Sequence, residues 1–147
     1  MSTANDVEQL LTHVQALMDK EQWRDAIELL KRNVSTIDQN WALQWNLGWC
    51  YFKLEQMSEA QKYLTKALQF APNRFSCKFG LGMVFLKKHR YKKAEQILSE
   101  ALDIKKGHHL IRISLALAYL GQGKIEQAEK LHVEGIKLKP KDSERYE

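Results

Sequence analysis

The sequence predicts an all-α protein built from helical repeats. Its 147 residues contain only two prolines and seven glycines, whereas an all-β chain needs a turn signal about every 8 to 12 residues. A self-similarity returns every 34 residues, and periods of about 20 to 50 residues are typical of repeat arrays. The length and the 44% of hydrophobic residues suit one domain with a core.

The repeat becomes visible when the stretches 46–51, 80–85 and 114–119 are aligned, because each lies 34 residues after the previous one. In the same frame Ala60, Ala94 and Ala128 align, and Pro72 and Pro140 close two of the repeats. This pattern resembles the tetratricopeptide repeat, whose unit carries Leu-Gly, a following aromatic residue, two small residues and a final proline. The resemblance implies a right-handed α-solenoid of four helix-turn-helix units.

We expect one tetratricopeptide repeat domain over residues 1–147. Its units are predicted at 7–40, 41–74, 75–108 and 109–142, and residues 143–147 begin a truncated fifth unit or a cap. The second unit matches best, whereas in the first only Ala26 matches outright, as expected of a terminal repeat. The helix pairs are predicted at 6–19 with 22–36, 41–54 with 57–70, 75–88 with 91–104, and 109–121 with 124–137. Small residues such as Gly48 and Gly82 are predicted to be close helix contacts.

Nothing that follows residue 142 is long enough to cover the apolar side of the helix at 124–137. Solenoids usually need a polar cap at each end. We therefore expect either that the sequence is the N-terminal module of a longer protein, or that self-association, for example as a homodimer, covers this side. The sequence also has neither a signal peptide at its start nor an apolar run of about 18 residues, which predicts a cytoplasmic protein without a membrane span.

The resemblance also implies a binding site, because in this family the first helix of each unit lines the concave face. Those helices are apolar all round, which indicates burial on both faces, by core on one side and a partner on the other. A groove of this kind suits an amphipathic helix or an extended apolar segment of a partner protein. The alternative is that neighbouring first helices pack together and close the groove. Gly80 would leave a notch beside Phe79, and Leu110 and Leu120 flank Ile113 and Leu117 on the same helix. The implied groove residues are Trp45, Asn46, Trp49, Phe52, Lys53, Phe79, Met83, Leu86, Ile113 and Leu117.

The best-known site of the family, a clamp for acidic chaperone tails, is not expected here. In both frames that we tested, only Asn46 matches the five clamp positions. A carboxylate bound there would face apolar walls without the cationic donors that offset its desolvation.

The charge is uneven: residues 1–73 carry 7 Lys and Arg against 9 Asp and Glu, whereas residues 74–147 carry 16 against 9, a net charge of +7. Such a basic edge could contact nucleic acid, an acidic protein or anionic lipid. We favour a solvated turn and do not expect nucleic acid as the partner, because aromatic residues are not interleaved with the charges. The edge consists of Lys87, Lys88, Arg90, Lys92 and Lys93.

No catalytic or metal-binding motif is recognisable in the sequence. Cys50 and Cys77 are predicted to be buried, reduced thiols, and His13 and His132 to lie at helix-packing positions. We therefore expect no enzyme activity, no cofactor and no metal, and predict a protein-binding scaffold or adaptor. The alternative is an N-terminal recognition module of a larger enzyme, such as a glycosyl- or sulfotransferase.

Overall fold

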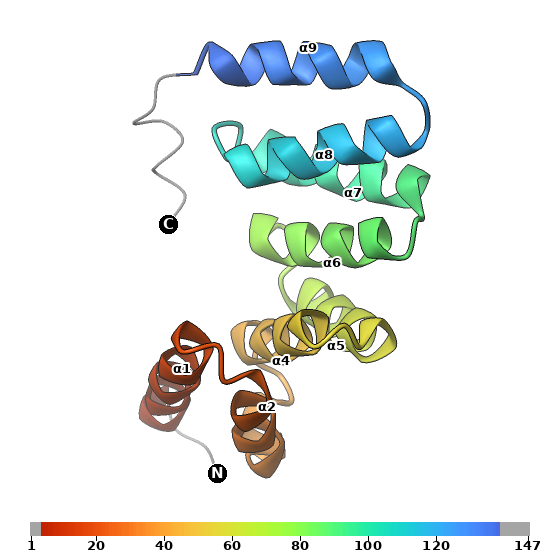
Figure 1. Ribbon diagram of the computed structural model, residues 1–147. Helices are drawn as coiled ribbons and strands as arrows, with labels where there is room; N and C mark the ends of the chain where they lie inside the picture. Colours follow the sequence, from red (N-terminus) through yellow and green to blue (C-terminus); the bar gives the residue numbers. More distant parts are fainter. Residues whose placement is uncertain (1–3, 139–147) are drawn as a thin grey trace. The chain divides into compact units, whose positions relative to one another are not determined.

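The computed structural model describes residues 4–138, and every regular element among them is a helix, which confirms the all-α prediction. The described residues form two compact units, which meet between Pro72 and Asn73 in the sequence. The predicted end of the fourth repeat at 139–142 and the segment 143–147 lie outside the described residues. The first unit contains α1 (Ala4–Asp19), α2 (Trp23–Arg32), α3 (Val34–Ile37), α4 (Trp41–Lys53) and α5 (Met57–Phe70). The second contains α6 (Phe75–Lys87), α7 (Tyr91–Ile104), α8 (His109–Gly121) and α9 (Ile125–Ile136) (Figure 1).

The turn after the first helix of each pair has the same backbone structure in all four cases. The second residue after the helix adopts a left-handed conformation, and the next N–H donates to the carbonyl five residues earlier, always at 2.9 Å. This is the Schellman arrangement, which satisfies the last carbonyls of a helix. Its recurrence every 34 residues extends to the N-terminal pair, whose sequence matches the repeat least. The left-handed residues are Glu21, Glu55, His89 and Gly123, with φ of 57°, 60°, 59° and 75°.

The small residues of the repeat lie where two helices approach most closely. A Cβ atom added to Gly48 would lie 2.6 Å from Leu64 Cγ, and one added to Gly82 would lie 2.5 Å from Leu98 Cδ2. The repeat alanines Ala60 and Ala94 on the second helices are fully buried. The predicted close contacts are therefore present within both units.

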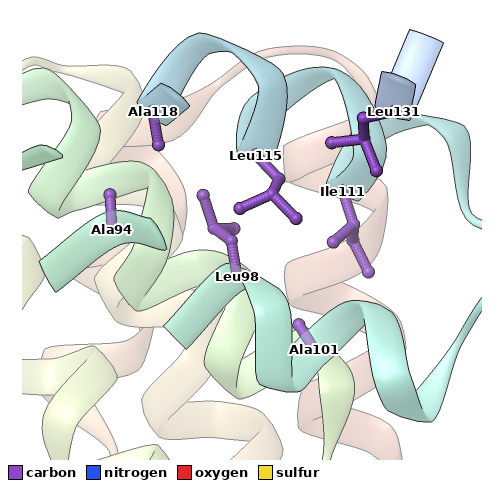
Figure 2. Packing of buried hydrophobic residues seen from close by; sticks show 7 residues of the cluster. All are labelled: Ala94, Leu98, Ala101, Ile111, Leu115, Ala118 and Leu131. Carbon is purple, nitrogen blue, oxygen red and sulfur yellow. The ribbon is translucent and has the colours of Figure 1, made fainter. Parts of the chain in front are cut away.

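The core of the second unit lies between α7 and α8 and reaches α9. Figure 2 shows Leu98 of α7 and Leu115 of α8 pointing toward one another, with Ile111 beside them. Leu98 and Ile111 are fully buried, and Leu115 is 3% exposed. These contacts fix α8 on the surface formed by α6 and α7.

The first unit departs from the predicted helix at 22–36, because that segment is divided into α2 and α3 at Asn33. The Asn33 side-chain amide donates to the Leu29 carbonyl at 2.8 Å, and the N–H groups of Thr36 and Ile37 donate to the Asn33 carbonyl. Asparagine competes for backbone hydrogen bonds in this way and is unfavourable inside helices. The side chain of Gln44 then fixes the turn before α4 by donating to the Ile37 carbonyl at 3.1 Å.

Candidate functional site

The predicted groove residues of the first unit form a stack of aromatic rings on α4. Trp45, Trp49 and Phe52 are spaced by about one helical turn and therefore lie on one face. The ring centroids of Trp45 and Trp49 are 5.2 Å apart, and those of Trp49 and Phe52 are 4.9 Å apart, with the ring planes nearly parallel. The Lys53 ammonium lies 5.7 Å from the Trp49 ring and 5.8 Å from the Trp23 ring. Both tryptophans of the stack are half-buried.

Two residues predicted to line the groove in this unit are instead buried. Asn46 and Phe52 are each 7% exposed, so they offer almost no surface to a partner. The physical reason is that α4 packs against every other helix of its unit, α1, α2, α3 and α5. Of the predicted groove residues on α4, only Trp45, Trp49 and the exposed Lys53 remain at the surface.

In the second unit, the predicted groove residues of α6 are partly covered by the next first helix. Phe79, Met83 and Leu86 are half-buried, and the expected notch at Gly80 is buried. The Ser114 hydroxyl of α8 lies 3.2 Å from the Met83 sulfur, and the Phe79 ring is 5.8 Å from the His108 ring. Packing between neighbouring first helices therefore closes part of this face.

The first helix α8 carries an exposed apolar stripe. Leu110, Ile113, Leu117 and Leu120 are 46%, 53%, 48% and 50% exposed, and their spacing places them along one side of the helix. Ile113 and Leu117 are the two groove residues predicted on this helix. A row of half-exposed large apolar side chains is the kind of surface that marks an interaction site.

A crevice between α8 and α9, with a volume of about 340 Å³, was not predicted from the sequence. His132 was assigned to a packing position but is exposed at the crevice, and Ile136 is 68% exposed. The sequence signal for this site is the small residue Gly135 at the last close-contact position of the repeat. The lining residues are His109, Arg112, Ile113, Ala116, Leu117, His132, Gly135 and Ile136.

Arg112 is the principal polar group of this crevice. Its Nη2 donates to the Lys106 carbonyl at 2.7 Å and its Nη1 to the Leu131 carbonyl at 3.5 Å. A carboxylate oxygen, Glu134 Oε2, is 3.7 Å from Nη1. The buried Nε has no hydrogen-bond partner, which leaves one donor of the guanidinium unsatisfied.

The basic edge lies at the end of α6, in the following turn and at the start of α7. Lys87, Arg90, Lys92 and Lys93 are exposed, and Lys88 is half-buried. The Lys93 ammonium lies 5.7 Å from the Phe85 ring. The geometry assigns no ligand to this edge, and its role as a solvated turn stays a prediction.

Both cysteines are buried and unpaired, as predicted. Burial raises the pKa of the Cys50 thiol to about 12 and that of the Cys77 thiol to about 11. Such thiols are poor nucleophiles near neutral pH. His13, predicted at a packing position, is exposed on α1.

Across residues 4–138 there is no group of three or more side chains of the metal-ligating types. None of the helices in this range combines the length and apolar character that crossing a membrane requires.

Comparisons with known proteins agree with the repeat. Two models of the tetratricopeptide repeat match residues 42–107 and 85–147. No curated protein sequence matches the chain significantly. A crystal structure of MamA protein is 26% identical, with 97% of this chain and 78% of that chain covered and a TM-score of 0.81. MamA from residue 41 to its end, from Desulfovibrio magneticus RS-1, is 16% identical, with coverage of 92% and 76% and a TM-score of 0.82, and this second likeness shows the fold alone.

Proposed function

This chain belongs to the tetratricopeptide repeat family, and we propose that it is a non-enzymatic scaffold or adaptor that binds an apolar or amphipathic segment of a partner protein. The fold is that of a protein-interaction scaffold. The proposed contact surfaces are the exposed parts of the first helices within each unit: Trp45, Trp49 and Lys53 on α4, and Ile113 and Leu117 on α8.

The observation that carries this proposal is the apolar stripe on α8. Its four large side chains are 46% to 53% exposed, and complete burial of such a side chain contributes about 1.5 to 3 kcal/mol. Covering the exposed halves would therefore contribute roughly 3 to 6 kcal/mol before the cost of association is subtracted. The stripe alone supports only weak binding.

The aromatic stack of the first unit provides the stronger anchor. Tryptophan is enriched among residues whose truncation costs most at interfaces, and Trp45 and Trp49 present parallel, half-buried rings. Because stacking already fixes their side-chain rotamers, a partner does not have to order them. The Lys53 ammonium beside Trp49 would favour an acidic or carbonyl-rich group of the partner next to this stack.

The test compares two exposed apolar residues of the second unit. Leu117→Lys removes a stripe residue, whereas Ile125→Lys, at a position that is 58% exposed at the start of α9, is the matched control. Partners captured by cross-linking would be identified, expressed and titrated against both variants, with circular dichroism as the check of folding. We expect Leu117→Lys to weaken binding about tenfold or more, which is about 1.4 kcal/mol, and Ile125→Lys to leave it unchanged. Equal affinities for both variants would contradict the proposal.

A further inference from the structure

The crevice between α8 and α9 has a counterpart one repeat earlier that is already occupied. Residues 34 positions before its lining lie on α6 and α7, and this is the surface on which α8 packs. Ile111 and Leu115 of α8 lie in the cluster with Leu98 and Ala101 (Figure 2), and Ser114 contacts Met83. The counterpart residues are Phe75, Lys78, Phe79, Gly82, Met83, Leu98, Ala101 and Leu102.

We infer that the α8–α9 crevice is a docking site for an amphipathic helix of a partner protein that carries acidic residues beside its apolar face. The inference deepens the proposed function, since it rests on the partner being a protein and specifies the form and charge of one segment. The helix would lie on α8 and α9 as α8 lies on α6 and α7.

The internal counterpart specifies the apolar pattern of the occupant. The buried apolar side chains that α8 presents to α6 and α7 are Ile111, Leu115 and Ala118, which are spaced by four and then three residues and lie on one helical face. Within residues 4–138 no segment covers the equivalent surface, where Ile136 is 68% and Ile113 is 53% exposed. A helix with two large apolar residues followed by a small one therefore fits this surface.

The volume of about 340 Å³ is at the low end of the roughly 300 to 1,000 Å³ that small-molecule pockets span. A small ligand would nevertheless leave Ile136 and the stripe residue Leu117 largely in water, because they lie at the rim of the crevice. A helix covers both, and for this reason we favour a helix.

The charge expected of the occupant follows from the residues that differ between the crevice and its counterpart one repeat earlier. His109 and His132 replace the apolar Phe75 and Leu98, so polar donors replace hydrocarbon. Arg112 replaces Lys78, which forms a 2.9 Å ion pair with Glu100.

The equivalent ion pair in the crevice, between Arg112 and Glu134, is longer than that between Lys78 and Glu100. The distance between Arg112 Nη1 and Glu134 Oε2 is 3.7 Å, and the hydrogen bond from Nη1 to the Leu131 carbonyl is long at 3.5 Å. A carboxylate from the partner could accept from Nη1 of this guanidinium, and a charge-assisted hydrogen bond of that kind is among the stronger ones in proteins. The net charge of +7 on residues 74–147 also favours an acidic partner through long-range attraction.

The inference can be tested with two synthetic helical peptides and the full 147-residue chain. Both peptides carry Ile, Leu and Ala at the spacing of residues 111, 115 and 118 on an alanine-rich helix; one has glutamates beside the apolar face and the other has lysines. Binding is measured by fluorescence anisotropy at two salt concentrations. We expect the glutamate peptide to bind at least about tenfold more tightly, and the difference to shrink as salt rises.

Matched variants assign the binding to the crevice. Ile136→Gln should weaken binding of the glutamate peptide about fivefold because apolar contact is lost, whereas Val133→Gln, which is also on α9 and 49% exposed but outside the lining, should not. Arg112→Gln should abolish the preference for glutamate, and Arg112→Lys, which restores the residue type found at Lys78, should retain it.

The inference would be overturned if the two peptides bound equally well, or if Ile136→Gln and Val133→Gln weakened peptide binding equally. It would also be overturned if sedimentation showed a self-association that only Ile136→Gln disrupts, because the occupant of the crevice would then be a second copy of the chain. Trp49→Ala separates this inference from the proposed function. That variant should weaken binding of the captured partner and leave binding of the glutamate peptide unchanged, because Trp49 is outside the crevice lining whereas Ile113 and Leu117 belong to both surfaces. Failure of the aromatic stack as a partner site and failure of the crevice are therefore distinguishable.

Discussion

The neutral imidazole of His108 caps α8, and this arrangement makes the stability of the second unit depend on pH. His108 is 6% exposed, and its Nδ1 accepts the Ile111 N–H at 3.3 Å. Its ring lies 5.5 Å from that of Phe75 and 5.8 Å from that of Phe79. Burial, reinforced by His109 and Lys105, lowers the pKa of His108 from 6.5 to about 4. Protonation would remove the acceptor and place a charge beside apolar rings.

The sign of the effect follows from which state binds more protons. Between pH 6.5 and about 4 the unfolded state protonates this histidine and the folded state does not, so stability falls as the pH is lowered through that window and then levels off. A tenfold difference in proton affinity between the two states corresponds to about 1.36 kcal/mol. The whole loss is therefore roughly 3 kcal/mol, most of which has occurred by pH 4.5. The contribution is fully present above pH 6.5.

His108→Asn is the decisive variant, because the repeat itself contains this cap. Asn40 occupies the equivalent position before α4, where its Oδ1 accepts the Leu43 N–H at 3.0 Å. The asparagine variant keeps an acceptor that does not titrate. Urea unfolding at pH 7.5 and pH 4.5 should show a loss of stability on acidification that is roughly 2 to 3 kcal/mol smaller in the variant than in the parent protein.

The test compares how much the free energy of unfolding changes between pH 7.5 and pH 4.5 in the parent protein and in the variant. The smaller side chain of asparagine weakens packing against Phe75 and Phe79 equally at both pH values. Equal losses in parent and variant would refute the reasoning. A His108 imidazole that titrates near pH 6.5 in an NMR titration of the folded protein would refute it as well.

Three further predictions concern the repeat positions. Gly82→Ala should lower the free energy of unfolding by about 1 to 3 kcal/mol through overpacking against Leu98, measured by urea unfolding. Glu21→Gly, at a φ of 57°, should raise it by up to about 1 kcal/mol because the left-handed strain is removed, whereas Gly123→Ala, at 75°, should lower it by about 1 kcal/mol. Cys50, whose pKa is raised to about 12, should react with a thiol reagent at pH 8 only after denaturant is added.

Each of these predictions has an outcome that contradicts it. A neutral Gly82→Ala would show that α6 and α7 can separate without cost. A destabilised Glu21→Gly would show that the glutamate side chain contributes more than the strain removes. Rapid labelling of Cys50 without denaturant would place α4 among the elements that open locally.

Most helices could be predicted from the sequence because the 34-residue period places the same helix pair in successive repeats. The exception is the segment 22–36, which is divided at Asn33 in the unit whose sequence matches the repeat least. The close contacts at Gly48 and Gly82 were predictable for the same reason, since only small residues fit where two helices meet. The left-handed turns were harder to predict. Glu21, Glu55 and His89 carry no glycine signal, and only their alignment with Gly123 points to a shared backbone conformation.

The candidate site was predicted less well, because position on a helix does not determine what covers it. Asn46 and Phe52 occupy groove positions of the repeat, yet both are buried, because α4 contacts four other helices. Conversely, His132 occupies a packing position of the repeat, yet it is exposed. Both errors arise from tertiary contacts that differ from one repeat to the next.

Equivalent positions of α6 and α8 show how exposure is determined in the second unit. Met83 and Leu86 on α6 are half-buried, whereas Leu117 and Leu120, 34 residues later, are 48% and 50% exposed. The side chains are all large and apolar, so the difference comes from α8, which lies against α6. A helix docked on α8 and α9 would change the surroundings of Leu117 in the same direction. Binding in the crevice and binding along the stripe would therefore share buried surface, and the two events should be coupled in their affinities.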